Sequence, residues 1–184
     1  VVLSAHGRTT NMLIEAAEHA LSGSVGIEEV TRTHAILVRD LEVASNEVDA
    51  LLEELHSLLR GVSLIRELTR RTLDQIMSFG ERLSTTIVAA AMRNHGIEAN
   101  AINAWEAGMV TDSRHGSAAP LPEAEGSIAA ALGRMSGVPV VTGFLGRDHK
   151  GTITTLGRSG SDLSASLIGA ALQAEEVQIW TDVS

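Results

Sequence analysis

The side chains best suited to chemistry are concentrated in residues 154–162, whose sequence is Thr-Thr-Leu-Gly-Arg-Ser-Gly-Ser-Asp. The apolar and threonine-rich run 153–156 predicts a strand that leads into a loop with Gly157 and Gly160. Apolar residues at helical spacing follow, namely Leu163, Leu167, Ile168, Ala171 and Leu172. A strand, a glycine loop and a helix start, in this order, aim free backbone N–H groups and the helix dipole at a ligand. The stretch therefore predicts an anion-binding site.

The side chains of the same loop fit that chemistry. Arg158 carries a planar guanidinium suited to a carboxylate or a phosphate. Ser159 or Ser161 can cap the following helix, with Asp162 in or near its first turn. The alternative for this stretch alone is an ordinary strand-to-helix turn with a solvated arginine, because glycine loops are common.

A second polar loop, residues 6–11, follows a short apolar run over 1–4 that predicts a buried strand. Thr9 or Thr10 can cap the helix that we predict over 12–21. This order of elements can also present hydroxyl and N–H groups to a ligand. For this segment on its own, a plain connecting loop is the alternative.

The elements that must position these loops alternate between helices and strands. Residues 27–92 predict two to four helices beside a sheet, with an interruption around Gly80, which costs about 1 kcal/mol against alanine in a helix. A close approach of backbone or ligand would explain that glycine. Gly96 ends the last of these helices, another helix is predicted over 125–135, and residues 147–150 are interpreted as a charged turn. Further strands are predicted at residues 99–104, 109–111, 138–142, 152–156 and 177–180.

This alternation indicates an α/β fold with a mainly parallel sheet. In open sheets of this kind, ligands bind outside the carboxyl ends of the strands. The residues at or just past the predicted strand ends are Ser4, Gly143, Gly157 and Thr181. We therefore expect one shared site at this edge, formed by Ser4, Glu81, Gly143, Arg158, Asp162 and Thr181.

Composition excludes several classes of function. The formal net charge of −9 and the scarcity of aromatic residues, at 2%, argue against a nucleic-acid-binding surface. The chain has no cysteine, hence no disulfide framework, and it has no apolar run of about 18 residues that could span a membrane. The seven histidines are scattered and no zinc motif is present, so we expect no protein-held metal site. At 184 residues, the chain is one domain or a large piece of one.

Several blocks taken together resemble the catalytic domain of aspartate kinases, a branch of the amino acid kinase family. Besides residues 154–162, they are Val-Val-Leu-Ser-Ala at 1–5, Thr10-Asn11, Ser-Phe-Gly-Glu-Arg-Leu-Ser at 78–84, Val-Val-Thr-Gly-Phe-Leu-Gly at 140–146 and Glu-Val-Gln-Ile-Trp-Thr-Asp-Val at 176–183. The blocks occur in the family's order and cover most of the chain, least clearly over 22–73. The resemblance implies a three-layer αβα fold with a mainly parallel central sheet, and makes residues 1–184 part of an amino acid kinase catalytic domain.

The resemblance also implies phosphoryl transfer from ATP, with Mg²⁺, to the side-chain carboxylate of L-aspartate. Such chemistry needs positioning and neutralised charge rather than a protein nucleophile. Carried over residue by residue, Arg158 holds an aspartate carboxylate, Thr10 donates to a carboxylate, and Glu81 helps to bind the amino acid. Ser161 shares that site, and Asp162 is the organising acid that places the substrate ammonium or a catalytic lysine. The nucleotide-binding positions implied are Ser4, Gly157, Thr181 and Asp182.

The chain departs from the family's pattern at several points. Ser159 stands where the family usually has the first of two paired glycines, and a serine there is strained if the position needs a positive φ. The family's Lys-Phe-Gly-Gly loop is not in this sequence, and Lys150 lies in a different block. Neither the segment that usually follows Asp182 nor the ACT domains are present. We therefore expect the 184-residue chain to be a piece of a longer polypeptide, without appreciable kinase activity alone.

Two alternatives to an aspartate kinase remain at this point: a non-catalytic α/β module that binds small anions, and a family member acting on a different acid. Ordinary capping or surface roles are likewise the alternative for Thr10, Glu81 and Asp182. The resemblance further implies a homo-oligomer in the full-length protein. It also implies a cytoplasmic enzyme, or a plastid one if the source is a plant or alga.

Overall fold

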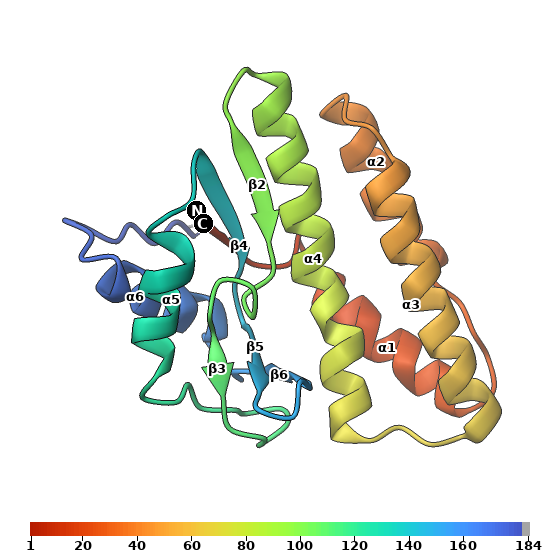
Figure 1. The fold of residues 1–184 in the computed structure, drawn as a ribbon. Coiled ribbons are helices and arrows are strands. Elements are labelled where there is room, and N and C mark those ends of the chain that lie inside the picture. The colour runs from red at the N-terminus through yellow and green to blue at the C-terminus, as the bar shows by residue number, and fades with distance from the viewer. Residues whose placement is uncertain (182–184) are drawn as a thin grey trace.

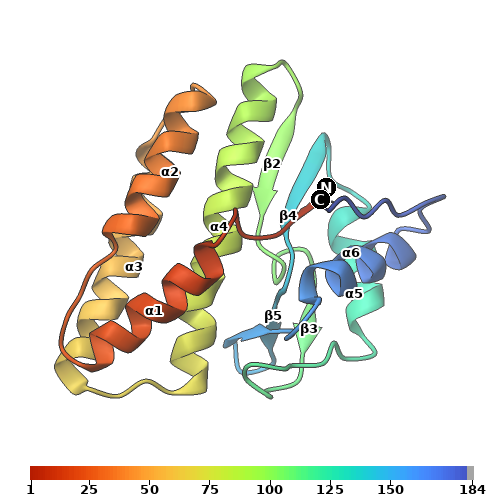
Figure 2. The ribbon, with the colours of Figure 1, turned by 180° about the vertical axis from the view of Figure 1, so that it is seen from behind.

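The computed structural model describes residues 1–181, which form three layers (Figure 1). A parallel sheet lies in the middle. One side is covered by α1 (Thr9–Leu21), α2 (Glu28–Asp40), α3 (Asn46–Ile65) and α4 (Arg70–Asn94). The other side carries α5 (Ala124–Leu132) and α6 (Gly160–Ala171), as the view from behind in Figure 2 also shows. The predicted three-layer α/β fold with a mainly parallel sheet is confirmed.

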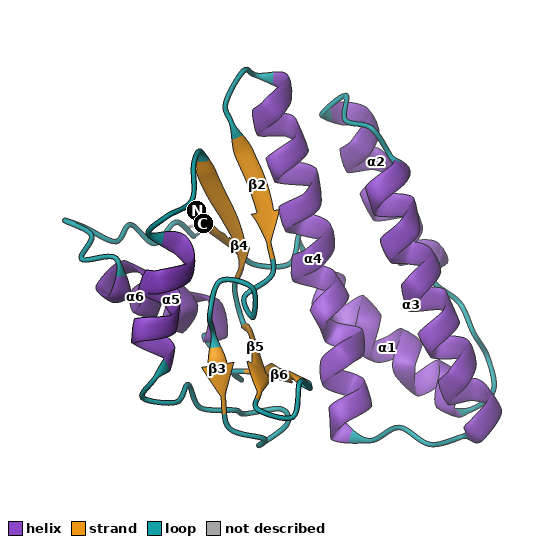
Figure 3. Cartoon of the chain, viewed as in Figure 1, coloured by secondary structure: helices purple, strands orange, loops and turns teal. Residues whose placement is uncertain are grey.

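The central sheet has the strand order β1 (Val2–Leu3), β4 (Val138–Thr142), β2 (Ala99–Ile102), and both pairings are parallel. Figure 3 shows β4 and β2 side by side. Leu3 pairs with Thr142 and Ile102 pairs with Val141, so the carboxyl ends of the three strands meet at one edge. The middle strand β4 has the continuous apolar run that a strand covered on both faces requires.

A second small sheet corrects one of our predictions. It consists of β3 (Val110–Thr111), β5 (Leu145–Asp148) and β6 (Ile153–Thr155), with β5 and β6 antiparallel. Residues 147–150 are therefore not one charged turn, because Arg147 and Asp148 lie in β5. The turn is closed by the Asp148 side chain, whose Oδ1 accepts the N–H groups of Lys150 at 3.0 Å and Thr152 at 2.9 Å.

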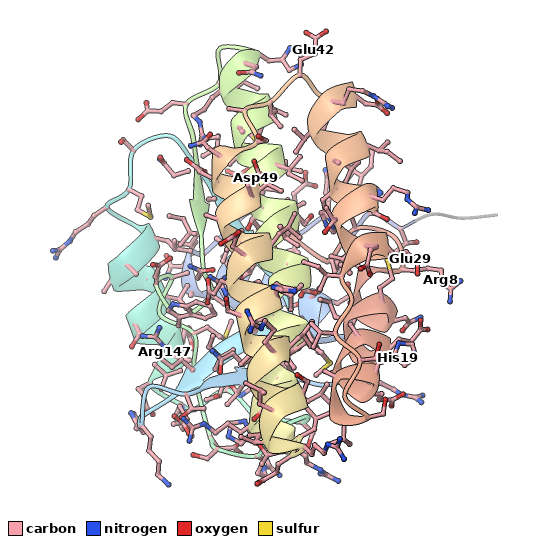
Figure 4. The ribbon with its side chains drawn as sticks, turned by 90° about the vertical axis from the view of Figure 1, so that its right-hand side faces the viewer. Arg8, His19, Glu29, Glu42, Asp49 and Arg147 are labelled. Atoms are coloured by element: carbon pink, nitrogen blue, oxygen red, sulfur yellow. The ribbon has the colours of Figure 1, made fainter. Side chains whose placement is uncertain are left out.

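The helical layer has its own apolar core, and its outer face is charged, as Figure 4 shows for Glu29 and Asp49. The α4 helix runs unbroken through Gly80, contrary to the predicted interruption. A Cβ atom at that glycine would lie 2.8 Å from the Ala5 Cβ atom, so the glycine allows α4 to pack directly on the loop after β1. No helix among residues 1–181 is long and apolar enough to cross a bilayer.

Two further local predictions were wrong. The threonines do not cap α1, because Thr9 is buried inside the helix start and its hydroxyl donates to the His6 carbonyl at 2.6 Å. Residues 177–180 do not form a strand. No strand among the described residues pairs with them, and Ile179 and Trp180 are 52% and 87% exposed.

Candidate active site

A cavity of about 380 Å³ opens at the carboxyl edge of the central sheet. Four segments supply its wall: the loop after β1, the start of α1, the middle of α4, and the turn that leads into α6. Its lining residues are Ser4, Ala5, Gly7, Thr10, Glu81, Phe144, Gly157, Ser159, Gly160, Ser161 and Asp162. Segments more than 150 residues apart in sequence therefore share one site, as proximity of parallel strand ends predicts.

Glu81 is the buried acid of this cavity, with only 3% of its surface exposed. The Ala5 N–H donates to its Oε1 at 3.2 Å, and its Oε2 has no hydrogen-bond partner within residues 1–181. Burial raises the pKa of Glu81 to about 7, against the opposing effect of the Ala5 N–H. An unpartnered carboxylate oxygen of this kind is suited to a cationic group such as a ligand ammonium.

The turn into α6 supplies the donors. Gly157 has φ +78° and Ser159 has φ +56°, so the chain reverses sharply before α6 begins at Gly160. Neither serine caps the helix, contrary to our prediction. Within residues 1–181, the backbone N–H groups of Ser161 and Asp162 make no hydrogen bond, which leaves them available to an anionic ligand.

The start of α6 is held against the end of β4. A Cβ atom at Gly143 would lie 2.8 Å from the Ser161 hydroxyl, so only glycine allows this approach. The Phe144 N–H donates to the Ser164 hydroxyl at 3.1 Å, one turn into α6. These contacts fix the direction in which the free N–H groups point.

A second cavity, of about 480 Å³, adjoins the first. The two share Ser4, Ser161 and Asp162, which form the wall between them. The rest of the second lining comes from Val1, β1, α6 and residues 178–180. Two neighbouring cavities separated by a hydroxyl, a helix N-terminus and a carboxylate could hold two small molecules side by side.

The structure brings most of the predicted site residues together. Ser4, Thr10, Glu81, Gly157, Ser161 and Asp162 line the first cavity. Arg158 is exposed on the same turn and is not part of the lining, and Thr181 directly follows Trp180 of the second cavity. Asp182 lies outside the described residues.

Sequence reasoning assigned no role to Ala5, Gly7 and Phe144, which also line the cavity. The signal available for Phe144 was its place directly after Gly143, at the end of an apolar run. Ala5 contributes a backbone N–H, which any residue type can supply. No group of three or more His, Cys, Asp or Glu side chains within residues 1–181 is arranged to hold a metal ion.

Comparison with known proteins places this geometry in context. The model of the amino acid kinase family matches residues 1–184. Aspartokinase 1, chloroplastic, of Arabidopsis thaliana is 42% identical over all of this chain and 34% of its own length. Lysine-sensitive aspartokinase 3 of Escherichia coli is 33% identical over all of this chain and 42% of its own length. The chain thus spans between a third and a half of each relative.

A solved structure agrees with these sequence matches. It is E. coli aspartokinase III in complex with aspartate and ADP (R-state). It superposes with a TM-score of 0.79 at 31% identity, covering all of this chain and 42% of that one.

Proposed function

The chain belongs to the amino acid kinase family, and on that premise we propose that the whole protein transfers the γ-phosphoryl group of ATP to the side-chain carboxylate of L-aspartate, giving 4-phospho-L-aspartate. One observation carries this proposal: the free N–H groups of Ser161 and Asp162 share a cavity with the unpartnered, buried Glu81 carboxylate. Donors and an acid in one cavity match an amino acid that carries two carboxylates and, on the same carbon as one of them, an ammonium group.

On the amino-acid side, the Glu81 Oε2 atom accepts from the substrate ammonium. Thr10 offers a hydroxyl to a substrate carboxylate from the start of α1, and Ser161 offers its hydroxyl and N–H from α6. Arg158 is exposed on the turn, and we assign its planar guanidinium the role of pairing with a substrate carboxylate. These groups orient the acceptor oxygen toward the neighbouring cavity.

On the nucleotide side, we assign ATP to the second cavity, which Ser4 lines. Gly157 of the adjoining first cavity, Thr181 and Asp182 are the other nucleotide-binding residues that we propose. The residues present fit a polyanion, since Ser4, Ser161 and the start of α6 offer neutral donors. When bound, ATP with Mg²⁺ supplies the transferable phosphoryl group and the charge neutralisation that the reaction needs.

Asp162 lies in the wall between the cavities and in the first turn of α6. We assign it the role of the organising acid, which orders the cationic groups around the acceptor carboxylate. The reaction requires no protein nucleophile, because the substrate carboxylate itself attacks phosphorus.

The whole protein is further proposed to act early in the biosynthesis of lysine, threonine and methionine. We propose a homo-oligomer located in the cytoplasm, or in a plastid if the source is a plant or alga. The chloroplastic relatives support the second location.

The test is aspartate-dependent release of ADP by the whole protein with Mg²⁺, with the acyl phosphate trapped by hydroxylamine. The expected product is the aspartate hydroxamate, formed by the wild-type protein and by Glu54→Gln, a control on the outer face of α3. Aspartate binding without turnover would indicate a non-catalytic binding module instead. Turnover with another acid in place of aspartate would identify a relative with a different substrate.

A further inference from the structure

A second buried carboxylate on α4 lies outside the cavity and has no part in the chemistry above. Asp74 is fully buried. Its Oδ1 accepts the Thr155 hydroxyl at 2.7 Å, and its Oδ2 lies 2.8 Å from the His115 Nδ1. The Gly116 N–H donates to both oxygens, at 3.1 and 3.0 Å. Two segments that are distant from α4 in sequence, residues 115–116 and Thr155, therefore converge on one side chain.

The partners of Asp74 act as donors, which defines the chemistry required there. A hydroxyl and a backbone N–H face the carboxylate, and the His115 ring donates when Nδ1 carries its proton. An ionised carboxylate accepts from all of them at once, whereas an asparagine would direct an NH₂ group at one of these donors. The position thus needs acceptor capacity at both oxygens.

The segments that carry the donors to Asp74 are in contact with residues that line the cavity. Thr155 stands two residues before Gly157, which lines the cavity wall. A Cβ atom at Gly157 would lie 3.4 Å from the Gly116 carbonyl oxygen, so the two loops are in contact. The Ala118 N–H donates to the Thr155 carbonyl at 2.8 Å and ties the loops together again. Fixing Gly116 and Thr155 therefore fixes the approach to the α6 turn.

Helix α4, which carries Asp74, also supplies the part of the cavity wall that contains Glu81. Asp74 and Glu81 are seven residues apart on α4, which is about two helical turns, so both side chains lie on one face of the helix. Glu81 accepts from Ala5 of the loop after β1, and Asp74 accepts from the loops beside Gly157. One face of α4 thus sets the spacing between the two walls.

We infer that Asp74 is a positioning residue for the site: its carboxylate holds residues 112–118 and Thr155 so that the Gly157 turn keeps its distance from Glu81. It acts without touching either substrate. The kinetic part of this inference rests on the proposed function, whereas the positional part does not.

The test compares Asp74→Asn with the wild-type whole protein by hydrogen exchange. We expect the hydrogen-bonded amides of residues 112–118 and the hydrogen-bonded Gly160 amide of the α6 turn to exchange on the order of tenfold faster in the variant, with those of α3 unchanged. Loop amides that accelerate no more than those of α3 would overturn the inference. This readout needs no enzymatic activity, so it decides on Asp74 even if the wild-type protein fails to phosphorylate aspartate. That failure would overturn the proposed function alone.

The kinetic arm separates positioning from mere stability. A loosened wall should raise the KM for aspartate on the order of tenfold, whereas a variant that only folds less well loses kcat at constant KM. An unchanged KM would therefore also refute the inference. The matched control is Glu54→Gln, which removes a carboxylate from an exposed ion pair with Arg82 of the same helix.

A second pair of variants applies if Asp74→Asn does not fold. Thr155→Val removes one donor without changing the size of the side chain, and Thr155→Ser keeps the hydroxyl. The valine variant should raise the KM for aspartate and accelerate loop exchange, while the serine variant should behave as the wild type. Equal behaviour of the two would overturn the inference.

Discussion

The buried Glu81 should make aspartate binding depend on pH in the neutral range. Its carboxyl has a pKa raised to about 7 by burial, so a substantial share is protonated at neutral pH in the free protein. A ligand ammonium needs the ionised form as its partner. Binding therefore selects the ionised form, and the apparent affinity scales with the ionised fraction.

The magnitude follows from that pKa. About a tenth of the Glu81 carboxyls are ionised near pH 6 and about nine tenths near pH 8. The apparent affinity for L-aspartate should therefore rise about tenfold over this interval and level off above it. Binding near pH 6 should release close to one proton for each ligand, and binding near pH 8 only about a tenth of one.

Calorimetric titration of the whole protein with L-aspartate measures both quantities, because heats in two buffers of different ionisation enthalpy report the protons released. Glu81→Gln removes the titrating group and should bind more weakly, without this pH dependence. Glu54→Gln, in an exposed pair with Arg82, should keep the wild-type profile. A flat wild-type affinity, or a pH dependence that persists in Glu81→Gln, would refute the assignment of the ammonium to Glu81.

The same pKa shift bears on stability, with a defined sign. The fold raises the pKa of Glu81 from 4.5 to about 7, so the neutral form is favoured in the folded state. The stabilising contribution of the Glu81 carboxyl to the unfolding free energy is fully present below its pKa in the unfolded state, 4.5, and is lost as pH rises through its folded-state pKa of about 7. The loss between about pH 4.5 and pH 8.5 should be about 3 kcal/mol. Urea unfolding at both pH values measures this loss. Between the two pH values, the unfolding free energy of Glu81→Gln should rise by that amount relative to the unfolding free energy of the wild type. An equal change of unfolding free energy with pH in the two proteins would contradict the prediction.

Three other substitutions test the geometry of the site, and a fourth, Gly61→Ala, serves as a control. Gly80→Ala places a Cβ atom 2.8 Å from that of Ala5 and should lower the unfolding free energy by about 1–3 kcal/mol, whereas Gly61→Ala, in an open part of α3, should raise it by up to about 1 kcal/mol. Thermal unfolding measures both, and equal effects would remove the close contact from the explanation. Ser159→Gly relieves a residue at φ +56° and should stabilise by about 0.5–1 kcal/mol in the same assay, so destabilisation would show that the serine makes compensating contacts. Arg158→Lys should weaken aspartate use by about 2 kcal/mol, read from the aspartate dependence of acyl-phosphate formation, because an ammonium cannot reproduce the planar fork; an unchanged dependence would exclude Arg158 from the site.

Several features were readable from local sequence. The apolar run 138–142 predicted β4 with its correct bounds, because a strand covered on both faces needs a continuous apolar segment. Gly96 follows the end of α4 with φ +77°, a conformation that glycine adopts without strain. The family blocks correctly predicted the three-layer fold. The positions of polar and glycine residues just past predicted strand ends also indicated which loops would meet at the sheet edge.

Other features depend on contacts that local sequence does not encode. Residues 145–148 form a strand because β6 pairs with them, while the more apolar residues 177–180 have no strand to pair with among the described residues. A strand satisfies its backbone groups only through a partner, so pairing decides where local preference does not.

Asp74 and Glu81, the two buried acids of α4, also show which features local sequence predicts and which depend on tertiary contacts. Sequence places Asp74 and Glu81 on one face of a helix, but a helix face of charged residues is ordinarily solvated. Only in the tertiary structure does Glu81 lie buried beside the Ala5 N–H, and that burial raises its pKa. Likewise, only the approach of Gly116 and Thr155, 42 and 81 residues away in the chain, makes Asp74 an internal anchor. The sequence determined which chemical groups were available, and the tertiary structure decided which of them lost their water and gained a partner, because desolvation depends on the neighbours that the fold supplies.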